Sequence, residues 1–128
     1  MTPIRVLLAD DHARFRQGVA SLLALERDFE VVGEASDGCQ ALQMTRELQP
    51  DVVLMDVSMP LMDGLEATRR IKAELPRVKI VILTVADGAR TRLEAERSGA
   101  KSCLPKVIEP QALFDALRDA VCDTPASH

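Results

Sequence analysis

The sequence predicts an α/β protein with a doubly wound, five-stranded parallel sheet and five helices. Three observations support this prediction. Five short apolar runs recur at fairly even intervals along the 128 residues, segments with helical spacing separate them, and three of the runs are continuous instead of alternating. Continuous runs of Val, Ile and Leu are typical of strands that helices cover on both faces, as in a parallel sheet.

The predicted strands coincide with the apolar runs. The continuous runs are residues 4–9, 51–56 and 79–84, and the set is completed by residues 31–35 and the weaker run 101–104. A helical segment lies between each run and the next, so each connection has the length and character of a crossover between parallel strands. Ligand sites in such sheets lie beyond the carboxyl ends of the strands, where the strand order reverses.

The intervening segments place apolar residues on one face of a helix. The four clearest faces are Phe15, Val19, Leu22 and Leu23; Ala41, Leu42, Thr45 and Leu48; Leu65, Thr68, Ile71 and Leu75; and Leu113, Leu117, Ala120 and Val121. The segment 89–98 is the most polar of the helix candidates, with Leu93 and Ala95 as its evident anchors. Gly99 is placed for a helix C-terminus and Pro110 for the first turn of the last helix.

Composition narrows the class of protein. A hydrophobic fraction of 47% and a charged fraction of 28% fit one compact domain and argue against a chain that is disordered as a whole. The net charge of −4 argues against a nucleic-acid-binding surface. No secretory signal or run of membrane-spanning length is present. Three cysteines without metal-ligand spacing, Cys39, Cys103 and Cys122, are expected to be reduced thiols, two or three of them buried, in a cytoplasmic protein.

Acidic residues stand at the carboxyl ends of two predicted strands. Asp10 and Asp11 follow the first strand, and Asp56 ends the third. Carboxylates that converge on one sheet edge repel one another, and Mg²⁺ relieves the repulsion because it accepts carboxylates, a carbonyl and waters. Thr84 ends the fourth strand and Lys106 follows the fifth, which supplies a hydroxyl and a counter-charge for a phosphoryl group on Asp56.

Each of these residues alone has a simpler interpretation. An Asp at a strand end is more often the N-cap of the next helix, a Thr is most often a strand residue, and a Lys is most often a solvated charge. His12 is best explained as a helix-start residue partly in solvent. The functional prediction therefore depends on the whole set lying together at one edge of the sheet.

The sequence resembles the receiver domains of two-component response regulators from Ile4 to about Val121, and most closely those of NarL/LuxR-type transcription regulators. The segments that carry the resemblance are Leu8-Ala9-Asp10-Asp11-His12, residues 51–64 with Met59-Pro60 and Asp63-Gly64 just after Asp56, Leu83-Thr84, residues 99–106, and Glu109-Pro110-Gln111-Ala112-Leu113. The second of these is the most specific, because the family pattern places a Met-Pro and an Asp-Gly after the phosphoacceptor.

The resemblance implies a role for each site residue. Asp56 is the expected phosphoacceptor, and Thr84 and Lys106 are expected to contact the phosphoryl group. Mg²⁺ is expected on Asp11 directly, on Asp10 largely through water, on Asp56, and on the main-chain carbonyl of Ser58. The module is then a signalling switch, not an enzyme beyond its own phosphorylation and dephosphorylation.

The resemblance also implies architecture and partners. It predicts a flavodoxin-like fold with strand order 2-1-3-4-5, a receiver domain over residues 1–122 and a flexible tail over residues 123–128. The expected partners are a histidine kinase or phosphotransfer protein, with a homodimer through helical faces as a further expectation. No helix-turn-helix segment follows in this sequence, so direct nucleic-acid binding is not expected, and without an apolar run of spanning length no membrane association is expected either. A receiver from a longer regulator and a single-domain protein both fit.

One departure from the family pattern affects the expected switch. Cys103 occupies the position on the fifth strand where the family usually has Tyr or Phe. It favours one alternative, a pseudo-receiver that works as a phosphorylation-independent interaction module, although the intact set of five site residues argues against it. A second alternative, a phosphate-ester hydrolase with an aspartyl nucleophile, ranks lower because Ser58 stands where that class needs an acid/base carboxylate.

Overall fold

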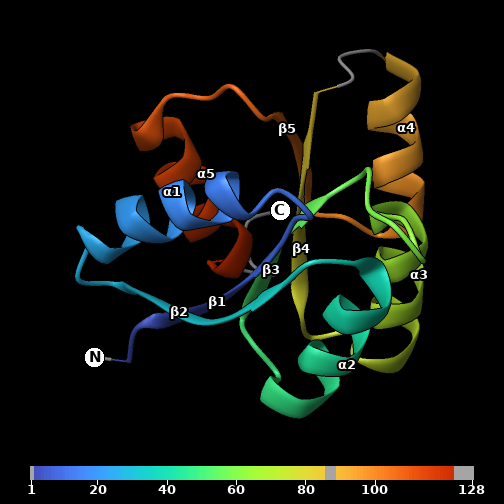
Figure 1. Ribbon diagram of the computed structural model, residues 1–128, viewed down its shortest axis with the longest axis horizontal. Helices are drawn as coiled ribbons and strands as arrows, with labels where there is room; N and C mark the ends of the chain where they lie inside the picture. The colour runs from blue at the N-terminus through green and yellow to red at the C-terminus, as the bar shows by residue number, and fades with distance from the viewer. Residues whose placement is uncertain (1, 86–88, 123–128) are drawn as a thin grey trace.

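The computed structural model describes residues 2–85 and 89–122, and these form a five-stranded parallel sheet with helices on both faces (Figure 1). The strand order is β2-β1-β3-β4-β5, which confirms the predicted order. The strands are β1 (Ile4–Ala9), β2 (Phe29–Ala35), β3 (Val52–Asp56), β4 (Lys79–Thr84) and β5 (Ser102–Pro105). The predicted tail, residues 123–128, lies outside the described residues.

Five helices connect and cover the strands. They are α1 (Ala13–Ala24), α2 (Gly38–Leu48), α3 (Gly64–Glu74), α4 (Ala89–Ser98) and α5 (Pro110–Val121). Asp37 and Asp63 fix the starts of α2 and α3, because their side chains accept hydrogen bonds from the backbone N–H of Gln40 (2.7 Å) and Glu66 (2.8 Å). No helix in the described part of the chain is long and apolar enough to cross a membrane.

The sheet separates two apolar cores. Leu7 and Ala9 of β1 point to the side covered by α2, α3 and α4, whereas Val6 and Leu8 point to the side covered by α1 and α5 (Figure 1). The same alternation runs along β3 and β4. Since both faces of each central strand are buried, the positions between the strand ends are apolar, which is why these runs are continuous in the sequence.

The structure corrects several details of the sequence-based expectations. Cys39 and Cys122 are exposed and Cys103 is half-buried, so the prediction of two or three buried thiols is wrong. Leu93 is 45% exposed, and α4 is anchored by Ala95 and Ser98 instead. Helical spacing shows which residues share a face, but it does not show how far a neighbouring element extends over that face.

Strand boundaries differ from the prediction by one or two residues. β2 begins at Phe29, earlier than predicted, because Phe29 packs into the core beside Phe114, with ring centroids 5.9 Å apart. β3 begins at Val52, and β5 extends from Ser102 to Pro105. Pro105 lacks a backbone N–H, and it is accommodated because β5 is an edge strand.

Gly64 brings the start of α3 against the end of β3. A Cβ atom at this position would lie 2.0 Å from the main-chain oxygen of Asp56, closer than any real contact. The Gly64 N–H also donates a hydrogen bond to the main-chain oxygen of Val57, at 2.8 Å. The glycine therefore allows the loop after β3 to fold back over the strand end that carries Asp56.

We predict that Gly64→Ala lowers the free energy of unfolding by about 1–3 kcal/mol, because a backbone oxygen cannot move aside cheaply. Gly18→Ala is the matched control, because Gly18 lies on the exposed side of α1 and an alanine methyl group there would meet no neighbouring atom within 4 Å. Alanine should stabilise this helix by about 0.5–1 kcal/mol. Urea denaturation of both variants measures the difference. Equal stabilities for Gly64→Ala and the unchanged protein would contradict the prediction.

Candidate functional site

The candidate site lies at the carboxyl edge of the sheet, where the chain leaves β1 and β3. These two strands are neighbours, with Ala9 opposite Met55. Asp10 follows Ala9 directly and Asp56 follows Met55, so both carboxylates leave the sheet at the same height. β1 is also the strand at which the chain order reverses, since β2 lies on one side of it and β3 on the other. The fold therefore places the acidic residues at the topological switch point.

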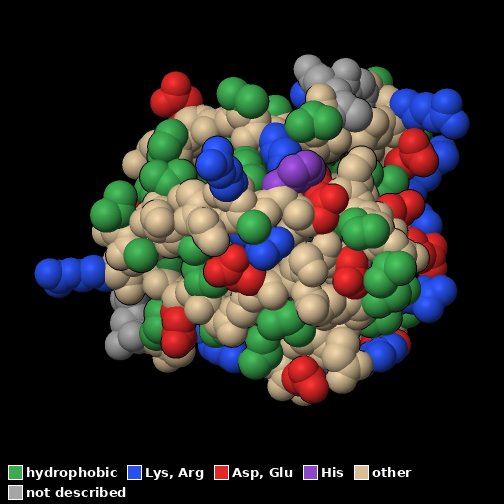
Figure 2. All heavy atoms as spheres, viewed as in Figure 1, with side chains coloured by type: hydrophobic (Ala, Val, Ile, Leu, Met, Phe, Trp, Pro, Cys, Tyr) green, Lys and Arg blue, Asp and Glu red, His purple; other side chains and the backbone are tan. Residues whose placement is uncertain are grey.

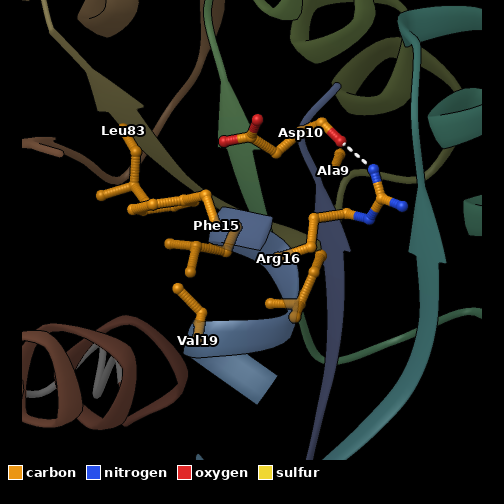
Figure 3. A pocket seen from close by; sticks show the side chains of 8 residues that line it. Ala9, Asp10, Phe15, Arg16, Val19 and Leu83 are labelled. Carbon is orange, nitrogen blue, oxygen red and sulfur yellow. Dashed lines mark hydrogen bonds between the residues drawn. The ribbon is translucent and has the colours of Figure 1, made fainter. Parts of the chain in front are cut away.

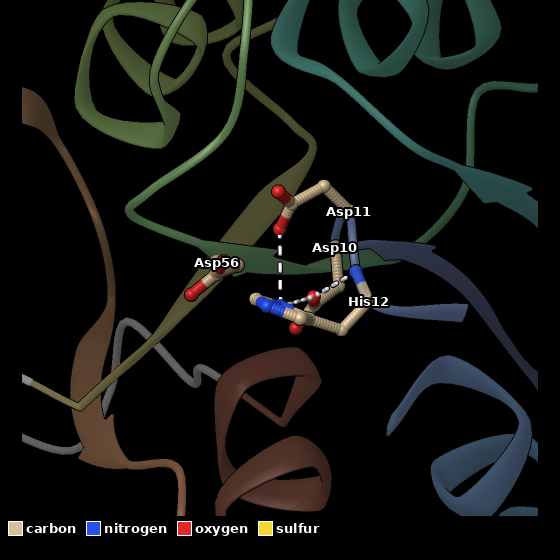
Figure 4. Close-up of side chains that lie close together, drawn as sticks. All are labelled: Asp10, Asp11, His12 and Asp56. Carbon is tan, nitrogen blue, oxygen red and sulfur yellow. Dashed lines mark hydrogen bonds and ion pairs between the residues drawn. The ribbon is translucent and has the colours of Figure 1, made fainter. Parts of the chain in front are cut away.

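Four side chains converge at this edge (Figure 4). Asp10, Asp11, His12 and Asp56 each offer one ligand atom, and these atoms all lie within 4.8 Å of one another. The side chains of Asp10 and Asp56 are 4% and 5% exposed, whereas that of Asp11 is 34% exposed. The cluster thus has a buried base of two carboxylates and a rim that faces solvent.

Burial and the closeness of Asp10 and Asp56 make it unfavourable for both carboxylates to be charged. Burial, and after it the negative charge of Asp10, raise the pKa of Asp56 from 3.8 to about 6, while Lys106 acts in the opposite direction. The Oδ2 atom of Asp56 is buried and accepts no hydrogen bond from the residues the structure describes. Such an oxygen is costly to bury, which indicates that the pocket is built to hold a further cation or donor.

Among the described side chains, Lys106 is the one cation that lies close to both buried carboxylates. Its Nζ atom lies 2.8 Å from Asp10 Oδ2 and 3.6 Å from Asp56 Oδ2, and the side chain is 10% exposed. The ammonium also lies over the ring of Phe15, 4.6 Å from the centroid. The close pair with Asp10 lacks hydrogen-bond geometry, so Asp10 Oδ2 remains unsatisfied within the described residues.

Thr84 lies on the strand next to Asp56, and Ser58 follows Asp56 by two residues in the chain. Thr84 is the last residue of β4 and is 7% exposed; Asp56 is opposite Leu83, so Thr84 extends one residue further along the neighbouring strand. The Lys106 N–H donates to the main-chain oxygen of Thr84 at 3.0 Å, which links the two strand ends. Ser58 is exposed and lines, with Asp11, an open hollow of about 470 Å³ above the carboxylates.

Sequence reasoning missed Arg16 and Phe15 as supports of the site. Arg16 donates a hydrogen bond to the main-chain oxygen of Asp10 (Figure 3). It also pairs with Glu34 at 3.1 Å. Beneath them a cavity of about 10 Å³, lined mainly by apolar side chains, has room for no more than a water molecule. Helical spacing places Phe15 on the core face of α1, but it cannot show that the ring extends under Lys106.

Cys103 lies beside a groove between α4 and β5. The groove measures about 210 Å³, and its lining includes Arg92, Ala95, Glu96 and Lys101. Cys103 is half-buried on β5, opposite Ile82. A thiol is much smaller than an aromatic ring, so this side chain leaves open a space next to β5, the strand that precedes Lys106.

The raised pKa of Asp56 implies a pH-dependent stability. A carboxyl group whose folded-state pKa exceeds its unfolded value stabilises the fold when protonated, and this contribution is lost as the pH rises from 3.8 through about 6. We predict that Asp56→Asn, in buffer with a chelator, raises the free energy of unfolding at pH 8 by about 1–3 kcal/mol. Urea denaturation should show this gain disappearing below pH 3.8.

Asp119→Asn is the control, because Asp119 is an exposed residue of α5. Its effect should stay within about 0.5 kcal/mol at every pH. A gain from Asp56→Asn that does not change with pH would show that the effect has another origin than the buried charge.

Comparison with known proteins gives the family. The family model of the response regulator receiver domain matches residues 6–118. The transcriptional regulatory protein LiaR of Bacillus subtilis (strain 168) is 44% identical over 117 residues, which cover 91% of this chain and 56% of LiaR. Against DegU of Brevibacillus brevis the identity is 37%, over 90% of this chain and 49% of that protein. The chain thus spans about half the length of the curated relatives it matches.

Solved structures agree in fold. The receiver domain of the response regulator NarL from Mycobacterium tuberculosis superposes with a TM-score of 0.86 at 31% identity, covering 92% of this chain and 98% of that one. A LuxR-family response regulator from Aurantimonas sp. SI85-9A1 gives a TM-score of 0.89 at 33% identity, and the match covers 94% of this chain and 86% of that one. This chain belongs to the family of response regulator receiver domains of two-component systems, and within it resembles the NarL/LuxR-type regulators.

Proposed function

We propose that this chain is a phosphoacceptor switch in which Asp56 takes a phosphoryl group from a histidine kinase or phosphotransfer protein. The observation that carries the proposal is the buried Asp56 carboxylate, whose Oδ2 accepts no hydrogen bond from the described residues while Asp10, Asp11 and Lys106 surround it. A structural carboxylate at this depth would be fully hydrogen-bonded. This one keeps an oxygen available for bond formation.

Phosphoryl transfer to Asp56 needs a charged nucleophile. Although burial raises the pKa of Asp56 to about 6, the carboxylate is still mostly ionised at neutral pH. One oxygen forms a bond to phosphorus while the P–N bond of a phosphohistidine, or the P–O bond of an acyl phosphate, breaks and its electron pair leaves with the donor. Lys106, 3.6 Å from Asp56 Oδ2, is placed to pair with the charge that the phosphoryl oxygens bring.

The pocket fits a hard divalent cation. Asp10, Asp11 and Asp56 offer carboxylate oxygens, two of them buried and without hydrogen bonds among the described residues. Ser58, whose carbonyl is the proposed further ligand, lines the hollow beside Asp11. This donor set suits Mg²⁺, which takes oxygen ligands and keeps several waters. Bound there, Mg²⁺ would offset the repulsion between the carboxylates and the incoming phosphoryl group.

Thr84 and Lys106 connect the site to a surface that can change. We propose that both contact the phosphoryl group, and that their movement biases β5 and the neighbouring faces of α4 and α5 between two arrangements. The main-chain hydrogen bond from Lys106 to Thr84 moves the two strand ends as a unit. Because Cys103 leaves the adjoining groove open, the response of this surface does not depend on an aromatic ring at that position.

The partners of the switch follow from its place in the family. LiaR and DegU are named as transcriptional regulatory proteins, and this chain matches about half of each. We propose that a histidine kinase or phosphotransfer protein supplies the phosphoryl group, and that the α4-β5-α5 surface passes the signal to an output domain, to a partner protein or to a second copy of the chain.

Incubation with acetyl phosphate and Mg²⁺ should yield one phosphoryl adduct per chain. Intact-mass spectrometry detects the adduct, and it should be absent from Asp56→Asn and from samples treated with a chelator. Asp63→Asn is a matched control, since asparagine can also cap α3 and the adduct should persist.

An adduct that survives in Asp56→Asn would overturn the assignment of the phosphoacceptor. Failure of acetyl phosphate and of candidate kinases, together with no Mg²⁺ binding by calorimetry, would favour the alternative of a pseudo-receiver that binds partners in its unmodified form.

Thr84→Val should separate phosphorylation from the response of the surface. Valine keeps the shape of the buried side chain but removes the hydroxyl, so Asp56 should still be phosphorylated, whereas the change in backbone amide resonances of Ser98 to Leu104 should shrink. Amide NMR spectra before and after acetyl phosphate measure this. Thr45→Val is the control, because the Thr45 hydroxyl bonds to Ala41 O (2.6 Å) inside α2. An unchanged response in Thr84→Val would contradict the coupling.

A further inference from the structure

His12 stands at the rim of the acidic pocket and turns its ring toward the carboxylates. It is the N-cap residue of α1, but its side chain makes no capping hydrogen bond. Instead, Nδ1 lies 3.1 Å from Asp10 Oδ1 and 3.1 Å from Asp11 Oδ1, with the side chain 67% exposed (Figure 4). In the space-filling view a histidine, in purple, lies at the surface next to acidic and basic side chains (Figure 2).

These distances match the edges of an octahedral coordination shell. Metal–ligand bonds of about 2.1 Å separate adjacent ligands by about 3.0 Å and opposite ligands by about 4.2 Å. The two Nδ1–oxygen distances of 3.1 Å are close to those of adjacent ligands, although the contact with Asp10 is a hydrogen bond that an ion would replace. The whole set, Asp56 included, lies within 4.8 Å, which is wider than the span of opposite ligands. A single ion can therefore contact the imidazole and the carboxylates once the most distant ligand atoms move inward by a few tenths of an ångström.

The charge of the pocket suits a divalent ion with a neutral imidazole. Three carboxylates and the Lys106 ammonium sum to −2 when all four are charged, so a divalent ion neutralises the cluster. Lys106 Nζ lies 2.8 Å from Asp10 Oδ2, on the other oxygen of the carboxylate that faces His12 through Oδ1. Lys106 Nζ also lies 3.5 Å from His12 Nδ1, so the ammonium has to withdraw toward Asp10 Oδ2 when an ion takes its place beside the imidazole.

We propose that Nδ1 of His12 is a metal ligand, and that it gives this pocket a preference for nitrogen-binding divalent ions such as Co²⁺, Ni²⁺ and Zn²⁺ over Mg²⁺. The proposal rests on the proposed function in that both use the same carboxylates. Imidazole is a favoured ligand of these transition ions, whereas Mg²⁺ prefers oxygen and retained water. The buried oxygen of Asp56 without a hydrogen bond among the described residues is the independent sign that the cluster takes a cation.

The test compares Co²⁺ and Mg²⁺ affinities by calorimetry, and by the visible absorption of Co²⁺, in the full chain and two variants. His12→Asn removes the imidazole but keeps a residue that caps helices well. His128→Asn is the matched control, because the sequence has two histidines. We expect His12→Asn to weaken Co²⁺ binding by about tenfold or more while Mg²⁺ affinity changes by less than about twofold. His128→Asn should change neither.

A second measurement needs no variant. On addition of diamagnetic Zn²⁺ to ¹⁵N-histidine-labelled protein, the Nδ1 resonance of His12 should shift in proportion to the bound fraction. Equal losses of Co²⁺ and Mg²⁺ affinity in His12→Asn, tighter binding of both ions, or an unshifted Nδ1 resonance would overturn the proposal. If acetyl phosphate still gives a Mg²⁺-dependent adduct, such a result leaves the proposed function intact; absence of Mg²⁺ binding and of the adduct would count against both.

Discussion

The structure of the site depends on the burial of like charges at the ends of the two central strands. Asp10 and Asp56 leave β1 and β3 side by side, and each is almost fully buried. Burial, and after it the repulsion from Asp10, raise the pKa of Asp56, and Lys106 offsets this only in part. A fold accepts such a cost where function requires a poised group. Lys106, which follows β5, and His12 at the rim both lie close enough to these carboxylates to affect the repulsion between them.

The supports of this arrangement come from elements distant in sequence. Phe15 of α1 lies under the Lys106 ammonium, and Arg16 holds the main-chain oxygen of Asp10. Gly64 lets α3 start against the main chain of Asp56. A two-sided apolar core fixes the sheet on which all of them are mounted. The carboxylates are therefore held by a rigid frame, while the rim of the pocket stays open to donors and ions.

The α4-β5 side of the molecule is the least conventional part of the switch. The family pattern leads one to expect an aromatic ring on β5, and Cys103 leaves a groove of about 210 Å³ in that region. The main-chain link between Thr84 and Lys106 does not involve this side chain. In the proposed switch, phosphorylation is coupled to the surface through the strand ends themselves, and the groove shapes the surface that a partner would meet.

The sequence by itself determined the class of fold, the strand order through the family resemblance, and the residues that stand at strand ends. It could do so because strand and helix periodicity are local, and because parallel strands bring their carboxyl ends to one edge. Only the tertiary structure decided which side chains are buried, as the exposed Cys39 and Leu93 show. The turn of the His12 ring toward the carboxylates was decided there too, since it depends on distances across the sheet edge that no local pattern encodes.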